Sequence, residues 1–456
     1  MAAWRLLAPG LLGALLSLPP GCVTPDLPPD LPAARDRGRP SSSARAGPPP
    51  AGKGGAPPLS SPRGDLTLEE ALSLALFGNP RLQAFSFQVR AAEARRLQAG
   101  RLPNPELSLE VEEFGGTGER AAFRSAQTTL ALSQVFQLGG KRAKREKTAA
   151  LERNLAAWDF EEARIDVYAR TAKAFVRLLA AQERLAAARQ GRDLAGRVRE
   201  LSSARVRAGK ASPLEETKAA LQFSVAQVAL DRARREEDLA RRRLAALWGE
   251  SRPRFRKARG PFRVLPDSLP PLSALEARLA SNPAVARWRD ETALGRARLE
   301  WARSLRWPDL TVGAGIQRFE EGDDQAFLVQ VSLPLMVFNR NQGKIREAEH
   351  LLARAAALRK AALVEARAAL ASAYRTLEET YGSARRFERE ILPSAERAFR
   401  AAGKGYEEGK FGYLQVLDAQ RTLLEARMEY TGILSAFHQA RIEIERLTRD
   451  SVGKKQ

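Results

Sequence analysis

Apolar and polar side chains alternate along four short stretches of the chain, two in its first half and two in its second. In the first stretch, Leu107, Leu109 and Val111 alternate with Ser108 and Glu110. A period of two puts the apolar set on one face of a β-strand and the polar set on the other. Glycine-containing segments separate the members of each pair, which predicts two antiparallel strand pairs. The stretches cover residues 107–112, 129–133, 310–317 and 327–333.

Much longer stretches carry apolar residues at the three- and four-residue spacing of an α-helix. Ile345, Ala348, Leu351 and Leu352 show this spacing, and the many alanines among such positions let helices approach closely. A helix of about 65 residues would be on the order of 100 Å long. Each long helix is expected to turn at a Gly-Lys pair and return, forming a helical hairpin. The outgoing helices cover residues 140–207 and 343–392, and the returning helices cover 212–248 and 412–448.

The same landmarks recur at a nearly constant distance, which indicates an internal repeat. Two Asn-Pro pairs lie 203 residues apart, two Gly-Lys pairs before the long helices also lie 203 apart, and two Gly-Lys pairs at the hairpin turns lie 200 apart. The chain is therefore predicted to contain two copies of one unit. The pairs are Asn79-Pro80 and Asn282-Pro283, Gly140-Lys141 and Gly343-Lys344, and Gly209-Lys210 and Gly409-Lys410.

Each unit is expected to contain a helix of about 35 residues, two strands and a helical hairpin. Proline ends the first helix, near Pro103 in one unit and near Pro308 in the other. Thr67 and Glu70 form the pattern of a capping box at the start of the first unit. The units are predicted to span residues 65–260 and 261–449, and residues 450–456 form a tail.

The N-terminal residues have the layout of a secretory signal, predicted to cover residues 1–21. A single arginine precedes an apolar run from Leu11 to Leu18, and Cys22 lies where a lipoprotein signal would be cleaved and acylated. Pro19 and Pro20 depart from the usual lipoprotein pattern, so an ordinary signal with an incidental cysteine is the alternative. Residues 22–64 are rich in Pro, Gly and Ser, and we expect them to form a disordered tether.

Four strands with one apolar face cannot form a closed core by themselves, and their two edges would carry unpaired backbone groups. Strands that span a membrane must close into a barrel, because lipid cannot satisfy a free edge. The smallest such barrels have about 8 strands. The sequence therefore predicts that several copies of the chain share one barrel.

The formal net charge is +21 at pH 7, which by itself would suit nucleic acid or an anionic membrane surface. However, the 75 basic residues are interleaved with 54 acidic residues along the helical stretches. That pattern is typical of solvated helix faces rather than of one nucleic-acid-binding patch. We expect no nucleic-acid partner.

The residues that support catalysis or metal binding are scarce. The chain has one cysteine and two histidines, and His350 and His438 have no partner at helical spacing, so surface or packing roles are expected for both. Glu69 and Glu70 are adjacent on a helix rather than facing each other across a cleft. Residues 116–128 lack the Gly-Lys-Ser/Thr ending of a phosphate-binding loop. We therefore expect no enzyme activity, no catalytic residues, no metal site and no cofactor.

The ordered set of motifs resembles the TolC-like outer-membrane efflux proteins, over about residues 66–449. The resemblance rests on Asn79-Pro80 and on the stretches PNPEL, LSQVFQLGGKR, LPLMVFNRNQGKI and EGKFGYLQVLDAQRTLLEARMEY. PNPEL, QLGGKR and FNRNQGKI look most like the heavy-metal branch of that family. The resemblance implies a mainly α fold with a small β part. It further implies a homotrimer with four strands per protomer in a 12-stranded transmembrane barrel, plus helical hairpins that form a periplasmic α-barrel.

In the family, the hairpin tips meet a periplasmic adaptor protein that joins the channel to an inner-membrane pump. The resemblance carries this role to residues on both sides of the two Gly-Lys turns. The alternative is that they are only glycine turns between helices. The residues are Val206, Ala208, Gly209, Lys210, Tyr406, Glu408, Gly409 and Lys410.

Beyond the second tip, the family often has two acidic residues that ring the pore entrance. The matching positions are Gln415 and Asp418, and the first repeat has Glu215 at the corresponding distance from its glycine. A ring of Asp418 would attract cations, although a plain surface aspartate remains the alternative. Glu110 and Glu112 lie on the polar strand face and are expected to line the barrel lumen.

The predicted function is an outer-membrane channel of a tripartite efflux system, with heavy-metal cations as the expected cargo. A drug or type I secretion duct remains open as an alternative, and a structural coiled-coil protein is less favoured because it would not need alternating strands. The basic surplus also suits anionic lipid headgroups near the barrel rim.

Overall fold

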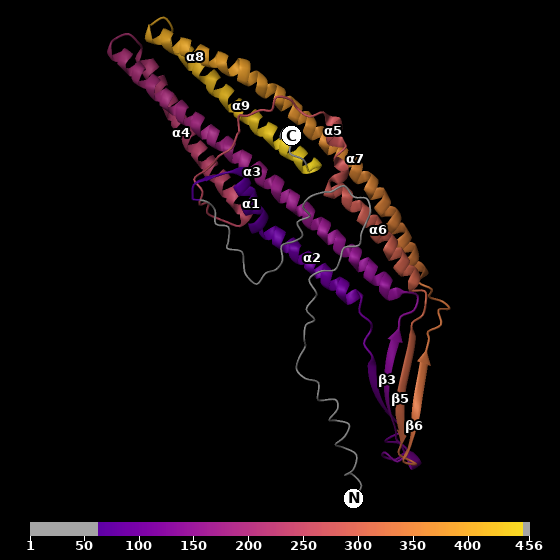
Figure 1. Ribbon diagram of the computed structural model, residues 1–456. Helices are drawn as coiled ribbons and strands as arrows, with labels where there is room; N and C mark the ends of the chain where they lie inside the picture. The colour runs from indigo at the N-terminus through magenta and orange to yellow at the C-terminus, as the bar shows by residue number, and fades with distance from the viewer. Residues whose placement is uncertain (1–62, 450–456) are drawn as a thin grey trace. The chain divides into compact units, whose positions relative to one another are not determined.

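The computed structural model describes residues 63–449 (Figure 1). The predicted signal, Cys22, all of the tether up to residue 62 and the tail lie outside the described residues. Contacts divide the chain into Met1–Lys53 and Gly54–Gln456, and the description below concerns the second unit alone. Within residues 63–449, no helix combines the length and the apolar content needed to cross a membrane.

The first predicted helix is in fact two helices, α1 (Leu68–Gly78) and α2 (Pro80–Ala99). The predicted capping box is present, because the Thr67 side chain and the Glu70 side chain each accept a hydrogen bond from the other residue's backbone N–H. The expectation of one helix of about 35 residues was wrong because Asn79 ends α1 and caps α2. Its side-chain oxygen accepts from the two backbone N–H groups that follow Pro80.

The second unit repeats this break at its own Asn-Pro pair. Asn282 caps the following helix, as Asn79 does in the first unit. The asparagines also hold the ends of the returning helices: Asn79 Nδ2 donates to Leu247 O (2.6 Å) and Asn282 Nδ2 donates to Leu447 O (2.8 Å). The two contacts thus repeat at a spacing of about 200 residues. The helical segments here are α5 (Leu272–Glu276), η3 (Leu279–Ser281) and α6 (Pro283–Ser304).

The predicted strands are confirmed, and they form one antiparallel sheet in the order β2-β3-β5-β6 in the described part of the chain. Strand β3 pairs with β5, so the sheet joins the two repeats. A separate short pairing joins β1 (Asp65–Leu66) to β4 (Lys257–Ala258). The strands of the main sheet are β2 (Glu106–Glu112), β3 (Gln127–Phe136), β5 (Leu310–Phe319) and β6 (Asp324–Ser332).

The register puts most of the large apolar residues of these strands on one face. Leu109 lies opposite Leu130, Leu130 opposite Ile316, and Ile316 opposite Phe327. Residues directly opposite each other in an antiparallel pair share a face. These four side chains are all exposed in the single chain, and Phe327 is 90 % exposed. The sheet therefore has an apolar face that nothing in the described residues covers.

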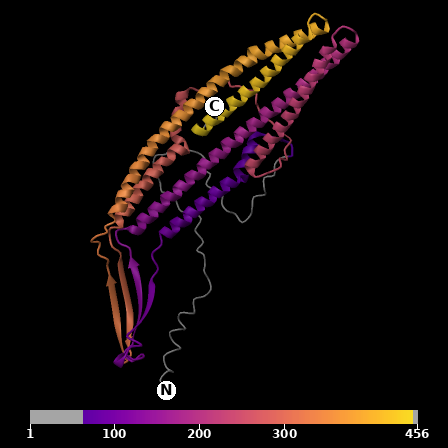
Figure 2. The ribbon, with the colours of Figure 1, turned by 180° about the vertical axis from the view of Figure 1, so that it is seen from behind.

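The long helices also match the predicted positions, and Figures 1 and 2 show them extending away from the sheet, with both hairpin turns at the far end. Helix α3 has 67 residues and is therefore about 100 Å long. The expected end of the second long helix near residue 392 was wrong. A π-helical segment, η4 (Phe387–Ile391), precedes Pro393, and the helix continues to Glu407. Such a segment lets the helix accommodate a proline, which has no backbone N–H to donate. The elements are α3 (Lys141–Arg207), α4 (Pro213–Ala245) with η2 (Ala246–Trp248), α7 (Gln342–Arg386), α8 (Leu392–Glu407) and α9 (Tyr413–Thr448).

Each change from strand to helix uses a residue in the left-handed backbone region. Gly140, with φ of 69°, precedes α3, and Asn341, with φ of 59°, precedes α7. Gly139 also has a positive φ, and a Cβ there would lie 2.8 Å from Trp307. Asparagine tolerates this conformation better than other non-glycine residues. The second helix therefore begins before the Gly343-Lys344 pair that the repeat had suggested as its start.

The largest cluster of buried side chains lies where α1, α3, α9 and the segment after α4 meet. Phe175, Trp248, Phe255 and Leu434 are part of this core. Much of the remaining helix surface is formed by alanine, arginine and glutamate. The core thus holds the middle of the helical region, between the sheet and the hairpin tips.

Candidate functional site

The two hairpin tips have the same backbone turn. In the first, Gly209 N–H donates to Val206 O (3.0 Å) and Lys210 N–H donates to Arg205 O (2.9 Å). In the second, the amides of Gly409 and Lys410 make the corresponding bonds, at 3.1 and 2.8 Å. This pair of bonds defines the Schellman motif, which needs a left-handed residue after the helix. The glycines supply it, with φ of 68° and 77°.

Most of the predicted tip residues are accessible. Lys210 and Lys410 are exposed, and the ammonium of Lys410 pairs with Glu408 at 2.7 Å. Val206 is half-buried. Tyr406 departs from the expectation of a contact residue, because its side chain is 2 % exposed and packs inside the protein.

Tyr406 instead joins the two hairpins. Its hydroxyl lies 3.1 Å from Ser202 Oγ and 3.5 Å from Glu215 Oε2, both on the first hairpin. The Arg205 guanidinium lies over its ring, 4.5 Å from the centroid, and also donates to its carbonyl. Tyr413 meets it edge-on from the second hairpin, and burial raises the pKa of the Tyr413 hydroxyl. The tips are therefore held together by one aromatic cluster with a polar rim.

The predicted entrance residues separate into two groups. Gln415 and Asp418 are both exposed on α9, about one turn apart. Glu215 is half-buried beside Tyr406, so it belongs to the cluster between the tips. The structure therefore brings Glu215 to the tyrosine rather than placing it as an equivalent of Asp418.

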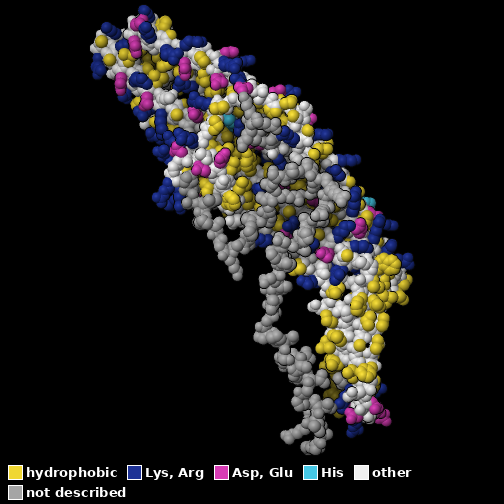
Figure 3. Space-filling view, in the orientation of Figure 1, with side chains coloured by type: hydrophobic (Ala, Val, Ile, Leu, Met, Phe, Trp, Pro, Cys, Tyr) yellow, Lys and Arg dark blue, Asp and Glu magenta, His cyan; other side chains and the backbone are white. Residues whose placement is uncertain are grey.

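The polar face of the sheet carries the two predicted glutamates. Glu110 lies opposite Thr129, and Glu112 lies opposite Gln127, so each carboxylate shares its face with polar neighbours. Figure 3 shows the apolar side chains that gather over the strands. Strands β2 and β6 are the edges of this sheet among the described residues.

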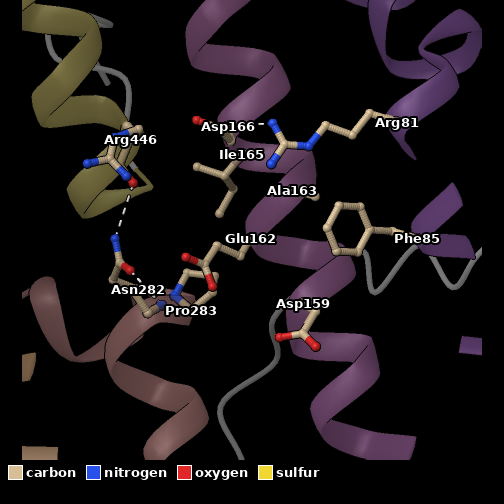
Figure 4. Close-up of a pocket in the computed structure, with 11 residues that line it drawn as sticks. Arg81, Phe85, Asp159, Glu162, Ala163, Ile165, Asp166, Asn282, Pro283 and Arg446 are labelled. Carbon is tan, nitrogen blue, oxygen red and sulfur yellow. Dashed lines mark hydrogen bonds and ion pairs between the residues drawn. The ribbon is translucent and has the colours of Figure 1, made fainter. Parts of the chain in front are cut away.

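Parts of α2, α3, α6 and α9 line a cavity of about 330 Å³. Figure 4 shows the residues around it. Three carboxylates from α3 line it: Asp159, Glu162 and Asp166. Arginines partner all of them, since Arg287 lies 3.0 Å from Asp159 and 3.2 Å from Glu162, and Arg81 lies 3.8 Å from Asp166. No group of three or more His, Cys, Asp or Glu in residues 63–449 is placed to hold a metal ion. The cavity therefore gives no basis for a metal site.

The two histidines differ in environment. His350 is exposed on α7. His438 is buried on α9, where its Nε2 lies 2.8 Å from Phe262 O and its ring packs against the rings of Phe262 and Phe437. Burial lowers the pKa of His438. These positions match the surface and packing roles predicted from their spacing.

Sequence reasoning missed the contacts that join the repeats. Nothing in the sequence marked Ser202 and Arg205 as partners of Tyr406. The one available signal was that Tyr406 stands where the first repeat has Val206. The ion pair between Lys141 and Asp309, 2.6 Å long, was also missed because its members are 168 residues apart.

The sheet has one uncovered apolar face, and the helical hairpins that continue from it are much longer than a compact domain needs. These two features are typical of membrane-associated proteins that combine a β-sheet with long helical hairpins. Comparison with known sequences specifies the class. The family model described as "Outer membrane efflux protein" matches residues 71–250 and 274–448. The chain therefore belongs to the outer membrane efflux protein family, whose location is the outer membrane.

Two relatives illustrate the similarity. The chain is 38 % identical to the cobalt-zinc-cadmium resistance protein CzcC of Cupriavidus metallidurans, over 84 % of this chain and 90 % of that protein. It is 27 % identical to the pyoverdine export outer membrane protein OpmQ of Pseudomonas aeruginosa, over 79 % of this chain and 80 % of that protein.

Solved structures share the fold. A crystal structure of the channel CusC superposes with a TM-score of 0.71 at 18 % sequence identity. The match covers 84 % of this chain and 92 % of that chain. The mainly α fold with a small sheet is thus the fold of a known outer-membrane channel.

Proposed function

We propose that three copies of this chain form an outer-membrane channel that exports heavy-metal cations as part of a tripartite efflux system. One observation carries the proposal: the β2-β3-β5-β6 sheet is apolar on one face and has two unpaired edges in the described residues. Lipid cannot satisfy such edges, so the sheet must close with other copies.

Closure by three copies gives a barrel of 12 strands, in which β6 of one copy pairs with β2 of the next. The apolar face, with Leu109, Leu130, Ile316 and Phe327, then meets lipid. The polar face, with Glu110 and Glu112, lines the lumen and gives it a local preference for cations.

The helical hairpins of three copies then form an α-barrel that extends into the periplasm. Each repeat contributes two strands and one hairpin, so residues 65–260 and 261–449 act as two versions of one building block. Support comes from the identical tip turns at Gly209 and Gly409 and from the equivalent Asn79 and Asn282 contacts.

Heavy-metal cations are the proposed cargo because the relative with 38 % identity over most of the chain is named a cobalt-zinc-cadmium resistance protein. The pyoverdine export protein, at 27 % identity, supports a second candidate in which the channel exports organic compounds. The choice between cargoes belongs to the energised pump, so the channel itself needs no metal ligands.

The exposed tip residues are the proposed contact with a periplasmic adaptor protein, which links the channel to an inner-membrane pump of the RND type. Ala208, Gly209 and Lys210 form one contact, and Glu408, Gly409 and Lys410 form the other, both at the end of the helices away from the sheet (Figure 2). Asp418 is the proposed acidic ring at the pore entrance. Acylation of Cys22 is proposed as an additional anchor in the outer membrane.

The barrel is tested by reversing the polarity of one position in β6. Val329→Arg puts a charge on the apolar face, whereas Gln330→Arg puts the same charge on the polar face of the same strand. An arginine facing lipid costs about 2–4 kcal/mol at the bilayer midplane. We expect V329R to abolish the trimer in outer-membrane extracts, measured by light scattering corrected for detergent, and Q330R to retain it. Equal behaviour of the two variants, or a monomeric wild type, would reject the shared barrel.

The cargo is tested separately, by metal tolerance in a host that lacks its own channel and expresses the cognate adaptor and pump. The proposal expects the chain to restore growth in zinc, cobalt or cadmium. Restored tolerance to drugs or detergents without metal tolerance would favour the second candidate.

A further inference from the structure

The two ends of the sheet carry opposite charge. At the helix end, the connections that join strands and helices, together with the adjoining helix turns, contain ten Lys and Arg and one acidic residue, Asp309. At the opposite end, the turns contain six Asp and Glu and three Arg. The helix-end stretches are residues 99–105, 136–145, 301–309 and 333–346, and the opposite turns are residues 113–124 and 318–324.

Some of the helix-end cations have structural roles. The ammonium of Lys141 pairs with Asp309, and Arg303 pairs with Glu349. Lys144 and Arg145 donate to backbone carbonyls. The remaining six are exposed and form no ion pair within residues 63–449. We call these six the basic collar: Arg101, Arg142, Arg306, Arg340, Lys344 and Arg346.

Exposed apolar side chains lie beside the basic collar. In the segment between β6 and α7, Leu335 is 81 % exposed and Phe338 is 92 % exposed. Trp307 is also exposed, and the Arg306 guanidinium lies over its ring at 5.9 Å. The segment continues directly from β6, where Phe327 and its neighbours form the apolar face. Figure 3 shows apolar and basic side chains next to one another at this junction.

We infer that the basic collar binds the phosphate groups of anionic phospholipids in the periplasmic leaflet of the outer membrane. The inference rests on the proposed function, because it requires the apolar face of the sheet to meet lipid and the helices to extend into the periplasm. Membrane-spanning barrels carry aromatic residues at the level of the headgroups, where Trp307 and Phe338 then lie. Lys and Arg just outside that level attract anionic headgroups.

Charge also argues for an anionic occupant of this surface. Arg340, Lys344 and Arg346 lie within seven residues of one another with no acidic residue between them. The proposed barrel brings these charges closer together, because Arg340 follows the edge strand β6 and Arg101 precedes the edge strand β2. Such a ring of like charges favours an anionic occupant. An anionic lipid surface neutralises them and covers the adjacent apolar side chains at the same time.

The test measures lipid retention on the full-length protein by native mass spectrometry, in mild detergent with equimolar phosphatidylglycerol and phosphatidylcholine. The wild type is expected to retain phosphatidylglycerol preferentially. In the variant R340Q/K344Q/R346Q, the ratio of bound phosphatidylglycerol to bound phosphatidylcholine is expected to fall about fivefold for each charge removed. The matched control R359Q/K360Q/R367Q removes the same charge from exposed positions farther along α7, and it should keep the preference.

Several results would overturn the inference. The first is a wild type that shows no preference between the two lipids. The second is an equal loss of preference in the collar variant and the control. The third is displacement of the bound lipid by millimolar inorganic phosphate. A folded collar variant that no longer forms the wild-type oligomer would assign the surface to contacts between copies. If that variant does not fold, the wild type is measured at higher ionic strength instead. The inference then requires the wild type to release phosphatidylglycerol but not phosphatidylcholine. The wild-type mass in the same spectrum tests the trimer, so failure of the proposed function is recognised separately.

Discussion

The ammonium of Lys141 lies 2.6 Å from the carboxylate of Asp309, across the junction between the sheet and the helices. Lys141 is the first residue of α3, and Asp309 directly precedes β5, so the pair ties the first repeat to the second. The Lys141 side chain is 6 % exposed, whereas that of Asp309 is 33 % exposed. The lysine therefore depends on this partner more than the aspartate does.

This asymmetry predicts unequal effects of removing either charge. D309N leaves a nearly buried ammonium without its counter-charge and should lower the free energy of unfolding by about 2–3 kcal/mol. K141M leaves an aspartate that water can reach and should cost about 1 kcal/mol. Thermal unfolding of the purified protein, followed by circular dichroism, compares them. Equal losses would show that the pair does not have this asymmetric role.

The glycines of the two hairpin turns should resist substitution for a conformational reason. Gly209 and Gly409 have positive φ, and a Cβ at either position would meet open space. G209A and G409A should therefore each cost about 1 kcal/mol, confined to the local turn. Hydrogen exchange at the amides of Lys210 and Lys410 measures the loss. G403A is the control: a Cβ at Gly403 would also meet open space, but Gly403 lies inside α8. Hydrogen exchange at the same amides should become slower or stay unchanged in this variant.

The Tyr406 cluster predicts different results for removing its hydroxyl and its ring. Y406F loses the bonds to Ser202 and Glu215 and should weaken the contact between the tips by about 1 kcal/mol. Y406A empties a buried site and should cost about 3–5 kcal/mol locally. Distances between spin labels on the two tips report the contact. Y374F, which removes a hydroxyl bond far from the tips, should leave those distances unchanged.

Burial of His438 predicts loss of stability on mild acidification. Its folded pKa lies below the ordinary value of 6.5, because burial disfavours the charged ring and Arg441 adds to the effect, while the bond to Phe262 opposes it. Between the lowered folded pKa and about 6.5, the unfolded chain binds a proton that the folded chain does not. Stability therefore falls as pH falls through this window.

The measurement is the unfolding midpoint between pH 7.5 and 5.5. H438N should flatten the slope in this range, although the substitution also lowers stability at neutral pH. H350N, at an exposed position, is the control and should retain the wild-type slope. A wild-type slope in H438N would assign the pH dependence to other groups. Glu443 is one such group: its pKa is lowered by bonds to Arg446 and Lys173 that outweigh its burial, so its contribution is lost only at more acidic pH.

The proposed entrance ring predicts opposite effects on ion selectivity at two neighbouring positions. D418N removes one carboxylate per copy and should lower the cation preference of single channels in planar bilayers. Q415E adds a carboxylate about one turn away and should raise it. If neither change alters the reversal potential across a salt gradient, Asp418 is a surface residue rather than part of a pore ring.

The local pattern predicted most elements because each depends on residues close together in sequence. The alternation around Leu109 and Leu130 predicted strands, and the proline-free stretch after Gly140 predicted a helix of about 65 residues. The same reasoning failed at Asn79, where a capping side chain divides one expected helix into two. It failed again at Pro393, where a π-helical segment lets the helix continue. In both cases the outcome depends on a specific backbone geometry rather than on periodicity.

By itself, the sequence determined the repeat, the strand faces, the hairpins and the two glycine turns, because periodicity and conformational preference act over a few residues. Only the tertiary structure decided that Lys141 meets Asp309, that Tyr406 lies inside the tips with Glu215, and that six exposed cations form no ion pair at the helix end of the sheet within the described residues. These relationships join residues up to about 200 positions apart. Packing of the two repeats brings them together, and no local preference specifies that packing.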